Sequence, residues 1–203
     1  MQIYHIVGPA PLFTNTFLAV DDAGTAVAVD PAAPVQEYLL GLEKHGAKLA
    51  AILLTHGHHD HVGTVAALKE STGAPVYMGR EDAQGTRLLP LRPGQVEHDL
   101  ADGDMLTFGQ MTFRVLRTPG HSAGSVCYLC DDVLFSGDTL FAGDIGRTDL
   151  DNSDPAAMEA TMRKLWAAFS GGEDVQVLPG HGEFSQMREE LAHNYYLRTY
   201  GAQ

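Results

Sequence analysis

The chain has 203 residues, of which 44% are hydrophobic and 19% are charged, and these values are ordinary for a globular protein. Its formal net charge of −13 at pH 7 repels nucleic acid and anionic membrane surfaces, and no basic stripe offsets that charge. No apolar run approaches the roughly 20 residues that span a bilayer. We therefore expect neither a nucleic-acid partner nor a membrane partner.

The chain shows no repeat and no linker, so we expect one domain over residues 1–203. Its first 15 residues lack a basic region followed by an apolar core, so no signal peptide is predicted. Cys127 and Cys130 lie three positions apart in a strand-like run, where side chains face opposite sides. We expect two reduced, packed thiols rather than a redox pair or half a zinc knuckle, which suits a cytoplasmic location.

The first part of the chain alternates strand-like runs of β-branched residues with helical patterns bounded by proline and glycine. A continuous apolar run, LAAILL, is typical of a strand that is covered on both faces. In chain order we expect strands at 3–7, 15–20 and 25–30, a helix at 34–46, a strand at 49–54 and a helix at 62–73.

The second part begins with a short strand and a polar, turn-rich stretch, 80–103, which shows no clear pattern beyond a short helix around EDAQG. Four closely spaced strand candidates within 105–137 predict an antiparallel meander. Ser153 and Pro155 indicate the start of an amphipathic helix, with Ser153 as its N-cap. The remaining elements are expected at 74–79 (strand), 153–169 (helix), 174–182 (strand and loop) and 184–200 (helix).

This order of strands and helices reads as one β/α half followed by another. Two sheets that pack face to face, with helices on both outer faces, would bury such a set of elements. The sequence therefore predicts an α/β fold built as a four-layer αββα sandwich.

A histidine-rich segment, THGHHDHVG at 55–63, follows the expected strand 49–54 directly. Three further polar candidates also lie in glycine-containing loops immediately after expected strands. Because strand ends converge at one edge of a sheet, we expect all of these side chains to meet there. The candidates are His56, His58, Asp60, His61, His121, Asp138 and His181.

Imidazoles and carboxylates without thiolates suit zinc, iron or manganese and argue against a structural zinc knuckle. Five histidines and two aspartates exceed what one tetrahedral ion can accept, and they suit two ions about 3.5–4 Å apart with one carboxylate bridging. Zinc is the expected metal, with iron and manganese as alternatives. His59 interrupts the ligand spacing and is expected to point away, and the other histidines are scattered surface or core-edge residues: His5, His45, His98 and His193.

The ordered motifs HGHHDH (56–61), GH (120–121), GD (137–138) and GH (180–181) resemble the metallo-β-lactamase superfamily over nearly the whole chain. The resemblance implies an αββα sandwich with its metals at one edge. It also implies that Asp30, in AVAVDPAA, supports and orients the ligands. The implied ligands are His56, His58 and His121 for one ion and Asp60, His61 and His181 for the other, with Asp138 bridging.

The stretch FAGDIGRTDL (141–150) is similar to the glyoxalase II-like and persulfide dioxygenase branches of that family. This similarity implies that Arg147 contacts an anionic, thiol-derived part of the substrate. True β-lactamases generally lack the bridging aspartate, so Asp138 disfavours β-lactam hydrolysis. Only one helix fits after His181. In this respect the chain resembles the compact bacterial glyoxalase II-like hydrolases rather than full-length glyoxalase II, which carries a glutathione-binding helical extension.

The expected activity is hydrolysis of a small-molecule thioester such as S-lactoylglutathione by a hydroxide that bridges the two metals. Asp60, which steers the hydroxide, and Asp138 are the expected catalytic residues. The alternative is a persulfide dioxygenase with one Fe(II) on His56, His121 and Asp138. Lactone hydrolysis is a less favoured option, and a non-catalytic metal-binding protein would show an eroded ligand set. The sequence makes no prediction about the oligomeric state.

Overall fold

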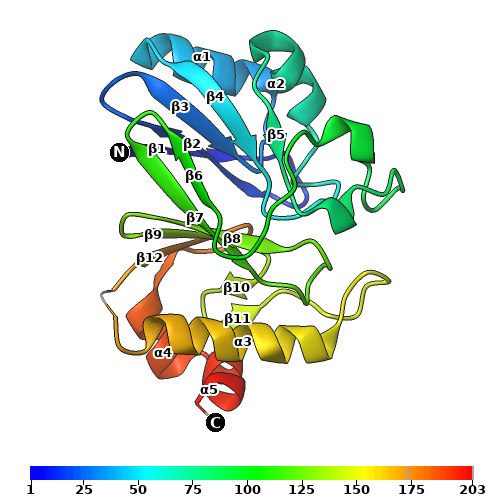
Figure 1. Ribbon diagram of the computed structural model, residues 1–203, viewed down its shortest axis with the longest axis vertical. Coiled ribbons are helices and arrows are strands. Elements are labelled where there is room, and N and C mark those ends of the chain that lie inside the picture. The colour runs from blue at the N-terminus through cyan, green and yellow to red at the C-terminus, as the bar shows by residue number, and fades with distance from the viewer. Residues whose placement is uncertain (173, 203) are drawn as a thin grey trace.

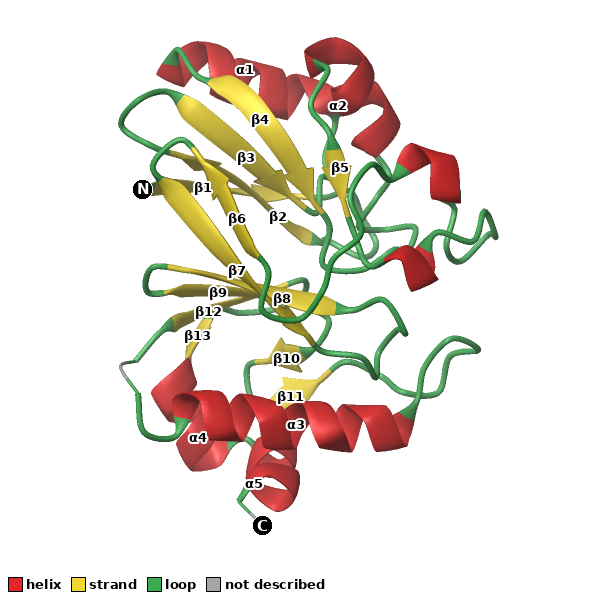
Figure 2. Ribbon diagram, viewed as in Figure 1, coloured by secondary structure: helices red, strands yellow, loops and turns green. Residues whose placement is uncertain are grey.

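The computed structural model describes residues 1–172 and 174–202, and residue 203, the end of the expected domain, lies outside them. Two β-sheets lie between two layers of helices (Figure 1), and Figure 2 shows these helical layers in red above and below the yellow sheets. Within the described residues, no helix combines the length and the apolar character needed to cross a bilayer.

The first sheet has the strand order β1-β2-β3-β4-β5, and its outer face is covered by α1 and α2. Strands β1, β2 and β3 pair in antiparallel fashion, whereas β3, β4 and β5 are parallel. Both helices end at a left-handed glycine, as the sequence predicted. The bounds are β1 Gln2–Val7, β2 Asn15–Val20, β3 Thr25–Val29, α1 Val35–His45, β4 Lys48–Leu53, α2 Val65–Thr72 and β5 Val76–Tyr77.

The second sheet has the order β13-β12-β9-β8-β7-β6. Strands β6 to β9 form the antiparallel meander that the sequence predicted, and β12 pairs parallel to β9. A separate hairpin of β10 and β11 follows β9. The bounds are β6 Met105–Phe108, β7 Met111–Arg117, β8 Val126–Cys130, β9 Val133–Gly137, β10 Leu140–Phe141, β11 Asp144–Ile145, β12 Gln176–Pro179 and β13 Ser185–Gln186.

Three helices, α3 (Pro155–Phe169), α4 (Met187–His193) and α5 (Tyr195–Gly201), cover the outer face of the second sheet. The apolar residues accordingly form three cores: one under α1 and α2, one between the two sheets, and one under α3, α4 and α5. Burial of these apolar surfaces is the main force that holds the layers together. The predicted four-layer αββα sandwich is confirmed.

The two cysteines lie as predicted on opposite faces of β8. Cys127 packs in the core under α3 to α5, and Cys130 packs in the core between the sheets. Both are buried and free. They act as small apolar residues of the two cores that β8 separates.

The N-cap of α3 is Asp154, so the prediction of Ser153 was wrong. The Asp154 carboxylate accepts hydrogen bonds from the backbone N–H groups of Ala156 and Ala157. Ser153 instead donates its hydroxyl to the carbonyl oxygen of His121, at 2.6 Å. The serine that the pattern predicts as an N-cap therefore stabilises the His121 loop at the sheet edge.

The single terminal helix expected at 184–200 was also wrong, because the segment divides into β13, α4 and α5. Asn194 has an extended backbone and separates the helices. Its Oδ1 accepts from the N–H groups of Tyr196 and Leu197 and so caps α5. Its Nδ2 donates to the carbonyl oxygens of Phe141 and Asp144, which lie far away in the sequence.

Candidate metal centre

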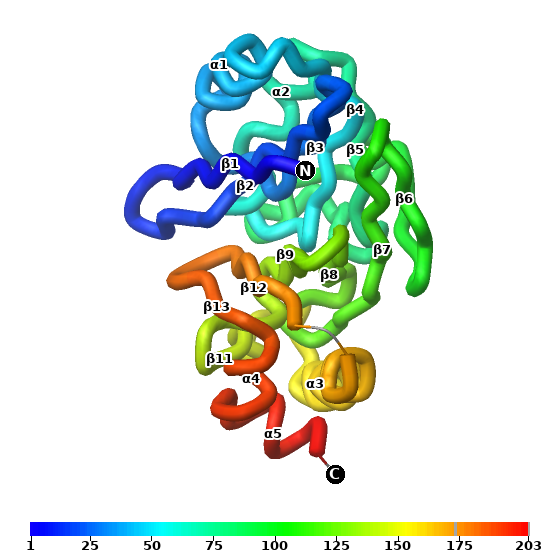
Figure 3. The backbone as a smooth tube through the Cα atoms, turned by 90° about the vertical axis from the view of Figure 1, so that its left-hand side faces the viewer, coloured from blue at the N-terminus to red at the C-terminus, as the bar shows by residue number. Residues whose placement is uncertain are grey.

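The structure brings all seven predicted ligands to one edge of the sandwich. Four of them follow β4 in the first sheet, and the other three follow β7, β9 and β12 in the second sheet. The two sheets are joined at this edge: the Asn15 backbone N–H, at the start of β2, donates to the Gly180 carbonyl oxygen at 2.7 Å. Figure 3 shows the dark-blue β1–β2 loop beside the orange loop between β12 and β13.

His56, His58 and His121 form the first cluster, in which one ligand atom of each lies within 4.8 Å of the others. The closest pair is His58 Nδ1 and His121 Nε2, 2.9 Å apart. All three side chains are buried. The opposite ring nitrogens lie within hydrogen-bond distance of fixed oxygens: Thr55 Oγ1 for His56, Asn152 Oδ1 for His58 and the Arg147 carbonyl for His121.

Asp60, His61 and His181 form the second cluster. His181 Nε2 lies 3.3 Å from His61 Nε2 and 3.3 Å from Asp60 Oδ2. The outer Nδ1 of His61 lies 3.0 Å from Asp30 Oδ2, and that of His181 lies 3.1 Å from the Leu12 carbonyl oxygen. The ring orientations of both histidines are therefore fixed from behind.

Asp138 lies between the two clusters. Its Oδ1 is 3.4 Å from His61 Nε2, and its Oδ2 is 3.4 Å from His121 Nε2 and 3.6 Å from His181 Nε2. One carboxylate thus faces ligand atoms of both clusters, the arrangement expected of a bridging ligand.

Asp30 stands behind the second cluster. Its Oδ1 accepts from the Thr55 backbone N–H at 2.7 Å, and its Oδ2 accepts from the Thr55 hydroxyl at 2.6 Å as well as from His61. Because both oxygens are occupied, Asp30 acts through His61 and Thr55. This is the supporting and orienting role that the sequence resemblance implied.

Several observations test whether these residues fit metal ions. An outer nitrogen that donates to an acceptor leaves the inner nitrogen as a lone pair, and here such lone pairs face one another. Among the described residues, His56 Nε2 and Asp138 Oδ1 are buried without a hydrogen-bond partner. Buried polar atoms are rarely left unpaired, and cations bound at the two clusters would give both atoms a partner. The donor set, imidazoles and carboxylates, fits divalent metals.

The electrostatics of the first cluster favour neutral imidazoles. Burial, followed by the charges of the surrounding histidines, holds the pKa of His56 well below its usual value. Burial and the neighbouring His121 lower the pKa of His58 in the same way. Metal binding requires neutral imidazoles, so these two side chains are in the form that a cation needs.

The electrostatics of the second cluster differ, because its carboxylates favour positive charge. Burial opposes ionisation of Asp138, but the nearby His61 outweighs it and lowers the pKa of the carboxyl. Burial likewise opposes a charge on His61, but Asp138 and Asp30 outweigh it and raise the pKa of His61 well above its usual value. A cation that binds here replaces a proton as the partner of these carboxylates.

A pocket of about 420 Å³ opens onto the centre. Arg147 lies in its wall, with its guanidinium paired to Asp149 at 2.6 Å between Nε and Oδ1. His59 has 57% of its side chain exposed and belongs to neither cluster, as expected. The apolar part of the wall consists of Leu12, Leu88, Phe141, Ile145 and Leu150.

The β10–β11 hairpin carries part of this wall and is held by buried residues that the sequence reading missed. Glu190 accepts from the Gly143 backbone N–H at 2.9 Å and from Asn194 Nδ2 at 2.8 Å. It also accepts from the Ser185 hydroxyl. Glu190 and Asn194 looked like ordinary helix residues, and no local pattern indicated this contact with the hairpin.

Two further residues missed in the sequence support the ligand loops. Asn15 Nδ2 donates to the carbonyl oxygens of Pro179 and Gly182, on either side of His181. Asp82, in a 3₁₀ turn (Arg80–Asp82), accepts hydrogen bonds near His58 and His121. Asn15 could have been noticed as a polar residue that starts a buried strand, whereas Asp82 lies in the stretch without a clear pattern.

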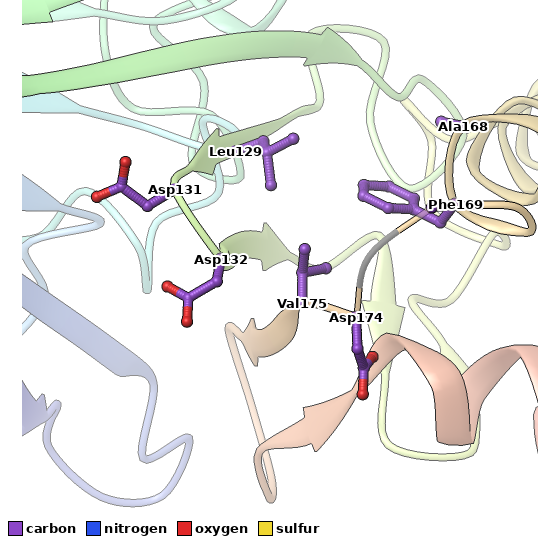
Figure 4. A pocket seen from close by; sticks show the side chains of 8 residues that line it. Leu129, Asp131, Asp132, Ala168, Phe169, Asp174 and Val175 are labelled. Carbon is purple, nitrogen blue, oxygen red and sulfur yellow. The ribbon is translucent and has the colours of Figure 1, made fainter.

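A second pocket, of about 610 Å³, lies away from the centre, between the β8–β9 turn and the end of α3. Figure 4 shows that the carboxylates of Asp131, Asp132 and Asp174 around it do not converge on one point. In the described part of the chain, none of the grouped potential metal ligands lies there. The candidate metal centre is therefore at the sheet edge.

Sequence comparison connects this centre with known proteins. The model of the metallo-beta-lactamase superfamily matches residues 9–181. A hydroxyacylglutathione hydrolase from Halorhodospira halophila is 39% identical over 87% of this chain and 64% of its own length. The hydroxyacylglutathione hydrolase GloC from Haemophilus influenzae is 29% identical over 91% of this chain and 93% of its own length.

Solved structures with the same fold also resemble this chain. BLEG-1 B3 metallo-beta-lactamase has a TM-score of 0.84 at 32% identity and covers 97% of this chain and 99% of its own. ETHE1 from Myxococcus xanthus has a TM-score of 0.83 at 29% identity, and the match covers 96% of this chain and 84% of the ETHE1 chain. TTHA1623 in a di-iron-bound form has a TM-score of 0.80 at 34% identity, and the match covers 95% of this chain and 99% of the TTHA1623 chain. The chain therefore belongs to the metallo-β-lactamase superfamily of metallo-hydrolases, which bind divalent metals.

Proposed function

We propose that this protein hydrolyses a small-molecule thioester, such as S-lactoylglutathione, at a centre of two divalent metals. The observation that carries the proposal is the position of Asp138 between two complete ligand clusters, beside an open pocket. The similarity to two hydroxyacylglutathione hydrolases supports this substrate class.

In this proposal His56, His58 and His121 hold one metal, Asp60, His61 and His181 hold the other, and Asp138 contacts both. Zinc is the favoured metal, with iron and manganese as alternatives. When bound, two such cations supply Lewis acidity and make a water molecule acidic enough to ionise near neutral pH.

The side chains around the centre have separate tasks. Asp60 has 16% of its side chain exposed, and hydrogen bonding from His181 together with the charge of His61 outweighs burial and lowers its pKa. Its carboxylate therefore stays ionised and can accept a hydrogen bond from the attacking water. The apolar side chains of Leu88 and Phe141 in the pocket wall shield the reacting carbonyl from bulk water.

The leaving group requires little help from the protein. A thiol has a pKa of about 8.5, so a thiolate departs without a strong general acid. Arg147, at the pocket wall, presents a guanidinium that suits a carboxylate of the thiol-derived part. It would exchange its present partner Asp149 for the substrate.

The proposal is tested by zinc loading followed by an assay with S-lactoylglutathione and a small panel of other thioesters. We expect turnover by the wild type and a fall of about 100-fold or more in Asp138→Ala, because the shared ligand is lost. Asp132→Ala, an exposed aspartate on the other side of the molecule, should keep full activity. Wild-type turnover no greater than that of Asp138→Ala for every thioester would contradict the proposal.

A persulfide dioxygenase is the second candidate, supported by the similarity to ETHE1 from Myxococcus xanthus. It would use one Fe(II) on His56, His121 and Asp138, a set of two histidines and one carboxylate. Oxygen uptake with glutathione persulfide by the iron-loaded protein, at one iron per chain, would favour this candidate. Two metals per chain without oxygen uptake favour hydrolysis.

A β-lactam belongs in the same panel because of the similarity to BLEG-1. We expect no β-lactam turnover, because true β-lactamases generally lack the bridging aspartate, whereas here the carboxylate of Asp138 stands between the two clusters.

A further inference from the structure

Asp82 is a fully buried carboxylate that belongs to neither cluster, with 0% of the residue exposed. Its Oδ2 accepts from the Gly57 backbone N–H at 2.9 Å and from the Ser122 hydroxyl at 2.6 Å. Its Oδ1 accepts from the Gly124 backbone N–H at 2.8 Å. Three donors thus converge on one side chain, which compensates the cost of burying it.

These donors belong to two different ligand loops. Gly57 lies between His56 and His58, whereas Ser122 and Gly124 come immediately after His121. One carboxylate therefore connects the two loops that supply the first cluster.

The contact between Asp82 and these loops is close. A Cβ added at Gly57 would lie 2.7 Å from Asp82 Cβ, and one added at Gly124 would lie 2.6 Å from Asp82 Cγ. The Gly57 backbone therefore packs directly against Cβ of Asp82, and the Gly124 backbone packs directly against its carboxyl group.

The second cluster has other supports. Asp30 fixes His61, the Leu12 carbonyl fixes His181, and Asn15 holds the backbone around His181. None of the hydrogen bonds described for residues 1–172 and 174–202 joins Asp82 to a member of that cluster.

We propose that Asp82 is a positioning residue that sets the spacing between the His56–His58 loop and the His121 loop, and so controls metal affinity at the three-histidine cluster alone. It acts through Gly57, Ser122 and Gly124 and contacts neither metal nor substrate. This inference rests on the proposed two-metal centre.

Asp82→Asn tests this role with the smallest change in volume. Asparagine has one acceptor oxygen, and its amide N–H₂ would face a backbone N–H that now has an acceptor. One loop must move away, which separates His121 from the other two histidines. Loss of such an orienting contact typically weakens metal binding about 10- to 100-fold.

Asp21→Asn is the matched control. Asp21 is also a buried aspartate that accepts from three backbone N–H groups, those of Ala23, Thr25 and Gln110. It lies after β2, at the end of the first sheet opposite to Asp30 and the metal centre. A general loss of stability should appear in both variants, whereas a loss of metal affinity should appear only in Asp82→Asn.

The experiment combines zinc titration against a chromophoric chelator with anomalous diffraction from zinc-loaded crystals, which reports the occupancy of each cluster. For Asp82→Asn we expect binding at the three-histidine cluster to weaken about 10- to 100-fold, while the other cluster stays within about 3-fold of the wild type. Asp21→Asn should bind both ions normally. If Asp82→Asn does not fold, Ser122→Ala, which removes one donor, should weaken the same cluster to a smaller extent.

Two results would overturn the role of Asp82: normal binding at both clusters, or equal weakening at both. The same two results for Ser122→Ala would overturn it where Asp82→Asn does not fold. A wild-type protein that binds no zinc would overturn the two-metal centre itself, and the proposed function with it.

Discussion

At the scale of single residues, each candidate histidine ligand carries its own orienting contact. His61 has the Asp30 carboxylate, His121 has the Arg147 carbonyl and His181 has the Leu12 carbonyl. The second nitrogen of each ring is thereby directed into the centre. The five acceptors are three side-chain oxygens and two backbone carbonyl oxygens, so the orientation of the ligands depends on residues outside both clusters.

The two thiols of β8 allow a test at the same scale. Burial raises the pKa of Cys127 and of Cys130 to about 11, so both are protonated and shielded at pH 8. We expect a disulfide reagent such as DTNB to leave the native protein unlabelled at pH 8 and to label two thiols per chain in denaturant. Fast labelling of the native protein would show that β8 does not lie between two cores.

The ligands were predictable from the sequence because histidine and aspartate carry their chemistry wherever they lie. Asp82 was not predictable, because its donors are groups such as the N–H of Gly57 and of Gly124, 25 and 42 residues away. Every residue except proline has such a group, so no pattern marks it.

At the scale of elements, the β10–β11 hairpin depends on the C-terminal helices. Glu190→Gln leaves one acceptor oxygen where the Gly143 N–H, the Asn194 amide and the Ser185 hydroxyl now donate. We expect the free energy of unfolding to fall by about 1–3 kcal/mol and the KM for thioester to rise, with metal content unchanged.

The matched control for this change is Glu189→Gln, on an exposed side chain that lies 3.6 Å from His193 on the same helix. An effect within about 0.5 kcal/mol is expected there. Denaturant unfolding and steady-state kinetics measure both variants. An unchanged KM in Glu190→Gln would mean that the hairpin keeps its position without this contact.

Helix α3 offers a second test at this scale. Leu165 is fully buried in the core beneath the C-terminal helices. Leu165→Ala should cost about 2–5 kcal/mol of unfolding free energy, because it removes apolar contacts and leaves a cavity. Leu40→Ala on α1, where 60% of the residue is exposed, should cost less than about 0.5 kcal/mol. Similar losses in both variants would contradict the assignment of the inner face of α3.

Element prediction succeeded where local patterns decide the structure and failed where distant contacts do. The meander β6 to β9 was predicted from four strand candidates at close spacing. The segment 184–200 was predicted as one helix, but Asn194 interrupts it and donates hydrogen bonds to the carbonyl oxygens of Phe141 and Asp144. Those partners are 53 and 50 residues away and leave no local signal.

At the scale of the whole molecule, the candidate ligands come from both sheets, so bound metal connects the two halves of the sandwich. A ligand at 100 times its Kd stabilises the folded state by about 2.7 kcal/mol per site. For a chain of this size that corresponds to a rise in Tm of roughly 5–10 °C per site. We expect zinc to raise Tm and EDTA to lower it.

Two histidine variants make that measurement specific. His121→Ala, which removes a ligand of the second sheet, should lose a large part of the zinc-induced shift. His193→Ala, with 76% of its side chain exposed on α4, should keep the full shift. Equal shifts in the two variants would mean that zinc stabilises the protein elsewhere.

The alternation of strands and helices was enough to predict the four layers, because few arrangements bury two such halves. The meeting of His56, His121, Asp138 and His181 at one edge followed from the rule that loops after strands converge. The joining of the two sheets through Asn15 and the His181 loop was not predictable, since it depends on the register of one sheet against the other.

The most direct test of this account is the number of metal ions that the purified protein retains, measured by elemental mass spectrometry after zinc loading and gel filtration. The account predicts two ions per chain for the wild type and a clear loss for Asp138→Ala. One ion or none per wild-type chain would contradict a centre in which Asp138 contacts two metals.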